Sequence, residues 1–230
     1  MEKRLKKTHA RTLGCGKATA KVALTLVLFF PALGVFNGLS EEKNGADKHV
    51  ASTVEVIDRI RPKELVTINA ILRSHRPDIS EPESWRLSEV ILEESAKRQL
   101  DPLLVTALIQ VESGFKSAIV SPVGARGMMQ IMPDTGKFLA EAVAREYGFQ
   151  RVAFRPESLD DPVFNLRLGI YYLHDLKKQF QHLNLALTAY NFGPADTHSR
   201  LENNLDLSDA FAGLVLDAYQ RHKKIRQPAF

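Results

Sequence analysis

The sequence predicts an all-α protein on the strength of three observations. Apolar residues recur at helical spacing in several segments, for example at Leu65, Ile68, Ile71 and Leu72. No stretch of useful length alternates apolar and polar residues as a half-buried strand would. Helix-starting and helix-stopping residues, such as Asp101-Pro102 and Gly114, bound the apolar segments. The expected class is therefore helices packed on helices.

Composition limits the size of the fold and the kind of partner. The chain has 230 residues, 44% hydrophobic and 25% charged, which suits one globular domain with additional segments. The formal charge of +4 is concentrated in residues 1–21, where seven basic side chains face one acidic side chain. The rest of the chain is therefore slightly acidic, and it offers no electrostatic basis for nucleic-acid binding.

The N-terminal segment resembles an export signal. The basic residues of positions 1–21 precede an apolar run of about 15 residues, Val22–Phe36, and this order is typical of a secretory signal. We expect residues 1–40 to be a signal peptide or an uncleaved membrane anchor, with the body of the protein exported. Cys15 precedes the apolar run, so it is not the lipidated residue of a lipoprotein, and a single cysteine forms no disulfide framework.

Residues 41–84 read as a linker followed by two extra N-terminal helices. The polar stretch from Glu41 to His49 predicts the linker. Amphipathic spacing then predicts helices over Ser52–Ile60 and Pro62–Ser74, and Arg76-Pro77 and Glu81-Pro82 interrupt the chain after them. These segments show no residues typical of catalysis.

The helix that begins at Asp101-Pro102 carries the most unusual acidic residue of the chain. A further helix, from Pro82 or Glu83 to Arg98, precedes it. Pro102–Val111 is almost wholly apolar and ends on Glu112, with Gly114 as the stop. Burial and the negative end of the helix dipole would both raise the pKa of this carboxyl group, which suits a general acid. The alternative is a helix-ending glutamate that points into solvent.

A loop rich in glycine and three further helical segments follow. Ser121-Pro122, Gly124 and Gly127 predict a surface loop that ends in an apolar patch around Gln130. The expected elements after it are a helix from Asp134 or Thr135 to Tyr147, a polar turn over Ser158–Pro162, a helix over Val163–Phe180, a short buried run over Leu185–Tyr190 closed by the turn Asn191–Pro194, and a last helix over Ser208–Ile225. We expect residues 85–226 to form the main domain and 227–230 a tail.

Common catalytic and cofactor motifs are absent from the sequence. The seven histidines lack the spacing of a zinc helix, and there is no Gly-x-Ser-x-Gly elbow and no phosphate-binding glycine loop. We therefore predict no metal and no cofactor.

Four ordered blocks of residues resemble the soluble lytic transglycosylase (SLT) domain family. The blocks are Glu112-Ser113, then Ser121–Ala125 with Gly127–Pro133, then Asp161-Pro162 with Asn165, Gly169, Tyr172 and Leu173, and last Ala189-Tyr190-Asn191 with Gly193-Pro194. The resemblance implies a fold like that of goose-type lysozyme and cleavage of bacterial peptidoglycan, with glycan strands as the partner and the periplasm as the location. It covers about Trp85 to Arg226.

The resemblance also implies a role for each matched residue. Glu112 would protonate the glycosidic oxygen between N-acetylmuramic acid and N-acetylglucosamine, and would then take the proton of the 6-hydroxyl as a 1,6-anhydro ring forms. Most glycosidases use two carboxylates instead. Ser121 and Gln130 would hold the acetamido sugar, and Met132 would flank its ring. The six substrate-binding residues that we predict are Ser121, Gln130, Met132, Tyr172, Tyr190 and Asn191.

Two aromatic positions leave alternatives open, and three residues depart from the family pattern. The hydroxyl of Tyr190 would reach Glu112 or the acetamido group, whereas Tyr172 has a similar role or is a buried structural residue. Met128, Phe192 and Ala195 depart from the family pattern, and the last two alter the expected shape of the groove. Other functions that fit the sequence are a hydrolysing lysozyme, a non-catalytic peptidoglycan-binding scaffold of an envelope machine, and a wall-opening enzyme dedicated to such a machine. The N-terminal segment also allows association with the inner membrane.

Overall fold

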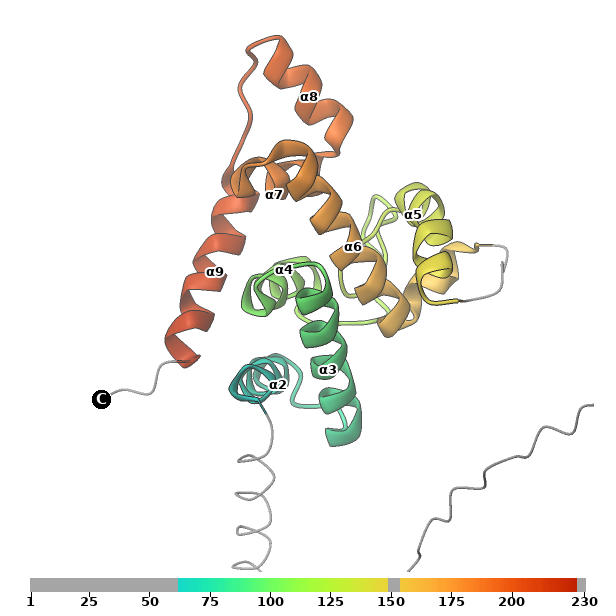
Figure 1. Ribbon diagram of the computed structural model, residues 1–230, viewed down its shortest axis with the longest axis vertical. Coiled ribbons are helices and arrows are strands. Elements are labelled where there is room, and N and C mark those ends of the chain that lie inside the picture. Colours follow the sequence, from blue (N-terminus) through green and yellow to red (C-terminus); the bar gives the residue numbers. More distant parts are fainter. Residues whose placement is uncertain (1–61, 149–153, 227–230) are drawn as a thin grey trace, which may run out of the picture. The chain divides into compact units, whose positions relative to one another are not determined.

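The described part of the chain is built of helices. The computed structural model describes residues 62–148 and 154–226 (Figure 1). The α-helices are α2 (Lys63–His75), α3 (Glu81–Lys97), α4 (Pro102–Ser113), α5 (Pro133–Glu146), α6 (Pro162–Phe180), α7 (Leu183–Phe192), α8 (Pro194–Glu202) and α9 (Ala210–Arg226), and a 3₁₀-helix, η1, spans Pro156–Asp160. Within these ranges β-structure is limited to isolated bridges of Arg126 with Val120 and with Ile131. The predicted all-α class is confirmed.

The structure tests only some of the predictions for the N-terminal region. The expected helix over Pro62–Ser74 is present as α2, whereas Ser52–Ile60, the linker and the apolar run Val22–Phe36 lie outside the described residues. Among the helices that the structure describes, none combines the length and the apolar character that a membrane crossing requires.

Helix α4 lies at the centre of the helical assembly. It packs against α9, α3 and α2, and Figure 1 shows these three helices around it. Every side chain from Leu103 to Ile109 is buried, as expected for a helix that is apolar on all sides. Asp101 caps the start of α4 by accepting a hydrogen bond of 2.8 Å from the Leu103 N–H, and Pro102 takes the first helical position.

Proline positions shift several predicted helix starts. Helix α3 begins at Glu81, with Ser80 as the N-cap, so Pro82 lies in the first turn of the helix instead of interrupting the chain. Helix α5 begins at Pro133 and not at a side-chain cap, and α6 begins at Pro162 with Asp161 as its cap. The fixed φ of proline suits the first turn, where its missing N–H has no partner to lose.

The region after α6 differs most from the prediction. Asn191 and Phe192 belong to helix α7, which ends at Gly193 with a φ of +91°, so the expected turn over these residues is wrong. Helix α8 was not predicted, because Thr197 is its only buried residue and its sequence carries almost no apolar periodicity. The predicted turn over Ser158–Pro162 is largely the 3₁₀-helix η1.

A buried group of charges ties the end of α5 to α3 and α6. Glu94 on α3 is only 4% exposed and accepts hydrogen bonds from the hydroxyl of Tyr147, directly after α5. Arg98 lies 3.8 Å from the Glu94 carboxylate and donates at 2.9 Å to Glu146, and Arg167 of α6 approaches Glu94 at 3.4 Å. A buried carboxylate needs such partners, so these contacts fix where α5 stands.

Candidate active site

Glu112 stands on the last turn of α4, where the chain leaves the core. Gly114 ends the helix in the left-handed conformation, with a φ of +58°. The Glu112 side chain is half-buried, and within residues 62–148 and 154–226 it makes no hydrogen bond and no ion pair. Burial raises its pKa from 4.5 to about 8. The predicted rise in pKa is confirmed, and the alternative of a fully solvated helix end is wrong.

The loop after Glu112 is folded by its own main chain. Ser121 accepts a hydrogen bond of 3.0 Å from the N–H of Ala125 through its hydroxyl and closes a tight turn that exposes Val123. Arg126 then pairs with Ile131 through two hydrogen bonds of 3.0 Å, which bring the end of the loop back beside its start. In this structure Ser121 therefore shapes the turn through its oxygen and keeps its hydroxyl proton for another acceptor.

Side chains from three helices hold the segment Met128-Met129 in place. The hydroxyl of Ser113 on α4 donates at 2.7 Å to the Met128 carbonyl, and that of Tyr190 on α7 donates at 2.9 Å to the Met129 carbonyl. Asn165 on α6 accepts at 2.7 Å from the Met129 N–H. Because buried main-chain groups need partners, these contacts specify the path of the loop.

Asn165 and Gly127 form the tightest contact of the site. The Asn165 side chain is fully buried, and its amide nitrogen donates at 2.9 Å to the carbonyls of Arg126 and Leu159. Gly127 has a φ of +77°, and a Cβ there would lie 2.2 Å from the Asn165 amide nitrogen. Both residues stand in the sequence blocks named above, but neither was predicted as a site residue, since a buried amide gives no sign of its partners in the sequence.

Gln130 is held with its amide nitrogen toward the protein. Its backbone φ is +47°, and its side-chain nitrogen donates to the carbonyls of Gly127 at 2.9 Å and Ile119 at 3.3 Å. The side-chain oxygen accepts no hydrogen bond from the described residues. It is therefore available as an acceptor, as an amide or hydroxyl donor of a ligand would need.

A hollow of about 140 Å³ gathers five of the predicted site residues. Its lining comes from the end of the loop, α5, α6 and α7, and consists of Gln130, Ile131, Met132, Thr135, Tyr172, Tyr190, Asn191, Phe192 and Gly193. Met132 is 42% exposed here, unlike its buried neighbours Met128 and Met129. Ser121 is not part of this lining. Ile131, Thr135, Phe192 and Gly193 line the hollow but were not predicted as substrate-binding residues, although Phe192 was expected to alter the shape of the groove.

Two tyrosine rings of the hollow lie side by side, and the charge of Glu112 acts on one of them, Tyr190. The rings of Tyr172 and Tyr190 lie 5.2 Å apart between centroids, and burial raises the pKa of both hydroxyls. The charge of Glu112 also raises the pKa of Tyr190, which requires the carboxyl group to lie near that ring. The expected contact of the Tyr190 hydroxyl with Glu112 is not made in this structure, because the hydroxyl donates to Met129 instead.

Metal ligands do not gather in the part of the chain that the structure describes. Residues 62–148 and 154–226 contain no group of three or more His, Cys, Asp or Glu side chains that could hold an ion. The polar groups of the hollow are neutral amides and hydroxyls, which suit an uncharged polar ligand.

Comparison with known proteins identifies the family. Residues 89–210, more than half of the chain, match the transglycosylase SLT domain, so the chain belongs to that family. The soluble lytic murein transglycosylase of Salmonella typhimurium is 32% identical over 134 residues, which are 50% of this chain and 20% of that protein. The endo-type membrane-bound lytic murein transglycosylase A of Klebsiella pneumoniae is 32% identical over 139 residues, 56% of this chain and 66% of that protein.

Solved structures of similar proteins come from the same group. The 70 kDa soluble lytic transglycosylase of Escherichia coli aligns with a TM-score of 0.43 and 25% identity over 60% of this chain and 21% of that one. A lytic transglycosylase of Pseudomonas aeruginosa aligns with a TM-score of 0.44 and 23% identity over 79% of this chain and 32% of that one. The chain spans a fifth or less of the soluble curated relatives from Salmonella and Escherichia coli K12.

Proposed function

We propose that this protein is a peptidoglycan lytic transglycosylase. It cleaves the β-1,4 bond between N-acetylmuramic acid and N-acetylglucosamine and leaves a 1,6-anhydro ring on the muramic acid. Membership of the SLT family and the names of its relatives support the reaction class. The observation that carries the mechanism is a half-buried Glu112 with a pKa of about 8, whose charge acts on Tyr190, a residue of a hollow lined by neutral hydrogen-bonding groups.

Glu112 acts first as a general acid. With a pKa of about 8 its carboxyl group is mostly protonated at neutral pH, as proton donation to a leaving oxygen requires. The proton passes to the glycosidic oxygen as its bond to C1 of muramic acid breaks. Positive charge develops on that sugar ring, and the oxygen of the muramic 2-acetamido group supports it.

Glu112 then acts as a base. Its carboxylate takes the proton of the 6-hydroxyl while the oxygen of that group bonds to C1, so the acid form returns and no water is consumed. One carboxyl group is enough for both steps. The lining of the hollow between Gln130 and Tyr190 supports this single-acid scheme, because its described members include no Asp or Glu.

Neutral side chains hold the sugar beside Glu112. The free amide oxygen of Gln130 accepts from the acetamido N–H, and Asn191 offers a second amide at the other side of the hollow. Met132 and Tyr172 supply apolar surface for the sugar ring. Ser121, at the turn of the loop, donates its hydroxyl proton to the glycan.

The protein acts outside the cytoplasm. The basic segment and the apolar run of residues 1–40 support export to the periplasm, with cleavage or with retention in the inner membrane. Residues 85–226 form the catalytic domain, and the preceding helices are the place for a partner of an envelope machine. The names of the relatives are consistent with this location.

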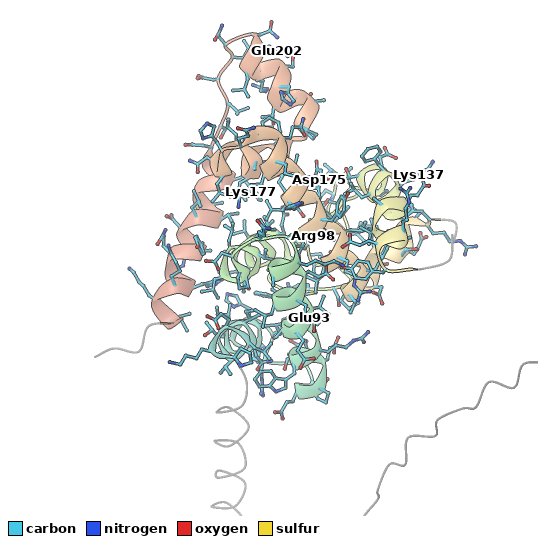
Figure 2. All side chains as sticks on the ribbon, viewed as in Figure 1. Glu93, Arg98, Lys137, Asp175, Lys177 and Glu202 are labelled. Carbon is cyan, nitrogen blue, oxygen red and sulfur yellow. The ribbon has the colours of Figure 1, made fainter. Side chains whose placement is uncertain are left out.

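The products of digestion test the proposal. Purified protein incubated with peptidoglycan sacculi is expected to release 1,6-anhydromuropeptides, identified by mass spectrometry. Glu112→Gln, which keeps the shape of the side chain and removes its proton, should release none. Glu93→Gln is the matched control, because Glu93 is an exposed carboxylate of α3 and labelled in Figure 2.

Two other results would replace the proposal. Products that end in reducing muramic acid would identify a hydrolysing lysozyme with the same acid. Binding to sacculi without turnover, unchanged by Glu112→Gln, would identify a scaffold that recognises the cell wall.

A further inference from the structure

Basic side chains gather where helices α2 and α9 end. Arg73 and His75 stand in the last turn of α2, and Arg221 and Lys224 stand in the last two turns of α9. The two helices pack against each other (Figure 1). Burial lowers the pKa of His222 on α9, and the charges of His75 and Arg221 lower it further. Because such effects act over short distances, the two helix ends lie side by side.

The segment after α4 adds a further cation to this end of the molecule. Lys116 lines an open hollow of about 560 Å³ together with His75, Arg76 and Asp78. Arg76 donates two hydrogen bonds of 2.8 Å to the Asp78 carboxylate, so these two charges balance each other. Arg73 lies three residues before Arg76, on the same side of α2. The unbalanced cations of this region, Arg73, Lys116, Arg221 and Lys224, form the basic face of the domain.

The basic face is not used by the fold. All four of its side chains are exposed, and none makes an ion pair or donates a hydrogen bond to the residues that the structure describes. Lys223 differs, since its ammonium lies 4.4 Å from the centroid of the Tyr219 ring. The helix dipole favours cations in a last turn, but Lys116 stands outside any helix. The basic face therefore has charge to offer to a partner.

Exposed apolar side chains accompany the cations on α9. Ile225 is 58% exposed beside Lys224 and follows Arg221 by one turn, and Leu214 is 59% exposed two turns before Arg221. Asp217 is the one acidic residue of this helix. Surfaces that lie on a membrane combine these two kinds of residue, because cations meet phosphate groups while apolar groups enter the interface. A hydrated anionic polymer would attract the cations but gain nothing from Ile225.

The sequence provides a tether to a membrane. Positions 37–62 join the apolar run Val22–Phe36 to the start of α2. A chain of about 26 residues reaches about 90 Å when it is fully extended. An apolar run that stays in the membrane keeps the basic face within this distance of the lipid. A tether of this length raises the local concentration of the two partners, so a surface of low intrinsic affinity is sufficient.

We propose that the basic face and Ile225 dock the domain onto a membrane surface of anionic phospholipids. This inference rests on the proposed function in its membrane-retained form, since the apolar run supplies the tether. Each exposed cation near such a surface raises the binding constant about fivefold. Docking holds the groove at a fixed height and orientation relative to the membrane.

The single tryptophan of the chain allows a test with the full-length protein. Trp85 stands on α3 beside Ser84, which accepts a hydrogen bond of 3.0 Å from Asn69 of α2. The protein is reconstituted into phosphatidylcholine vesicles that contain a dansyl-labelled lipid, with or without phosphatidylglycerol. Energy transfer from Trp85 to the dansyl groups is then measured. The transfer is expected to be larger with phosphatidylglycerol and to fall at high salt, which screens the cations.

Charge reversal on α9 isolates the basic face. Arg221→Glu combined with Lys224→Glu is expected to lower the transfer in phosphatidylglycerol vesicles to the value found in phosphatidylcholine. Lys137→Glu combined with Lys177→Glu is the matched control, because it makes the same change in net charge on exposed residues of α5 and α6, both labelled in Figure 2. The control should keep the transfer of the wild type. The basic residues of positions 1–21 are the same in every variant, so a difference between the variants reports the basic face alone.

Three results would overturn the docking surface. They are equal transfer in the two kinds of vesicle, wild-type transfer in the α9 variant, and the same loss in the α9 variant and the control. Arg73→Glu combined with Lys116→Glu, on other elements, should reproduce the loss, and it decides the question if thermal unfolding shows that the α9 variant is not folded.

Digestion of free sacculi separates this inference from the proposed reaction. The α9 variant should digest sacculi as the wild type does. A wild-type protein that docks but digests no sacculi contradicts the proposed reaction alone. One that digests sacculi but shows no lipid-dependent transfer contradicts the docking surface alone.

Discussion

The guanidinium of Arg76 donates a hydrogen bond of 2.9 Å to the main-chain oxygen of Phe115. Phe115 is buried and has a φ of +65°, so two left-handed residues in succession, Gly114 and Phe115, follow the helix of Glu112. Asp78 fixes the Arg76 side chain through two hydrogen bonds of 2.8 Å. Because α2 and Arg76 lie outside the matched residues 89–210, an element beyond the matched domain supports the exit of the chain from helix α4.

Replacing Arg76 by alanine is expected to weaken this support. The carbonyl of Phe115 would lose a charged donor, and the free energy of unfolding should fall by about 1–3 kcal/mol. Arg73→Ala is the control, since Arg73 is an exposed residue in the last turn of the same helix. Thermal unfolding of both variants checks the expectation. A melting temperature equal to that of Arg73→Ala would show that the contact contributes nothing.

Tyr190→Phe isolates the hydrogen bond that holds the Met129 carbonyl. The variant keeps the ring and leaves a buried acceptor without its donor, so we expect a loss of about 1–2 kcal/mol in unfolding free energy and a fall in kcat/KM. Tyr171→Phe is the control, because Tyr171 is half-buried on α6 and donates no hydrogen bond through its hydroxyl within the described residues. Urea unfolding and digestion of sacculi measure the two effects. Similar losses in both variants would count against the role of the Met129 contact.

Gly127→Ala and Gly124→Ala separate crowding from backbone strain. Both glycines have positive φ, but a Cβ at Gly127 meets the Asn165 amide and the Leu159 carbonyl within 2.4 Å, whereas one at Gly124 meets nothing within 4 Å. Gly124→Ala should cost about 1 kcal/mol, and Gly127→Ala should cost about 3 kcal/mol or more, with loss of activity. Comparable stabilities of the two variants in chemical denaturation would contradict the tight contact with Asn165.

Ionisation of Glu112 should destabilise the folded protein. The pKa of Glu112 is about 8 in the folded protein, and its reference value of 4.5 stands for the unfolded chain. Between pH 4.5 and pH 8 the folded state therefore binds more protons than the unfolded state, and the stability falls as the pH rises. We expect Glu112→Gln to be more stable than the wild type by about 2 kcal/mol at pH 8 and similar to it below pH 4.5. Glu93→Gln should show no such pH-dependent gain. Thermal melts across this pH range measure the stability of each variant. A difference in stability between Glu112→Gln and wild type that does not change with pH would overturn the raised pKa of Glu112.

The same group should set the alkaline limit of activity. Only the protonated Glu112 can donate to the glycosidic oxygen, so kcat/KM should decline as pH rises through about 8. The profile of kcat/KM against pH, measured with solubilised glycan, reports this value for the free enzyme. Activity that stays constant from pH 7 to pH 10 would exclude Glu112 as the acid.

The sequence predicted those parts of the site that depend on residues close to one another in the chain. The position of Glu112 followed from an apolar helix with a proline at one end and Gly114 at the other, and its raised pKa followed from that position. The role of Asn165 could not be predicted, because its partners lie in segments that only folding brings together. Helix α8 was not predicted for a different reason. It has one buried residue, so its sequence shows no apolar face that would indicate a helix.

The exposure of Phe138 on α5, the most exposed large apolar side chain of the described residues, could not be predicted from the sequence either. Phe138 fits an ordinary helix pattern, and only the packing of α5 beside α6 shows that its ring is left bare. The end of α7 was also predicted wrongly, but only by two residues. Gly193 does end that helix, but Asn191, a residue common in turns, made the helix seem to end earlier.

The three side chains that hold Met128-Met129 also bear on how the protein folds. They are separated from their partners by 15, 36 and 61 residues along the chain. Contacts over such distances close only after the helices that carry them have docked. The path of the loop is therefore set by the docked helices and not by the loop alone, and a change that loosens the packing of α4, α6 or α7 is expected to disturb the groove as well.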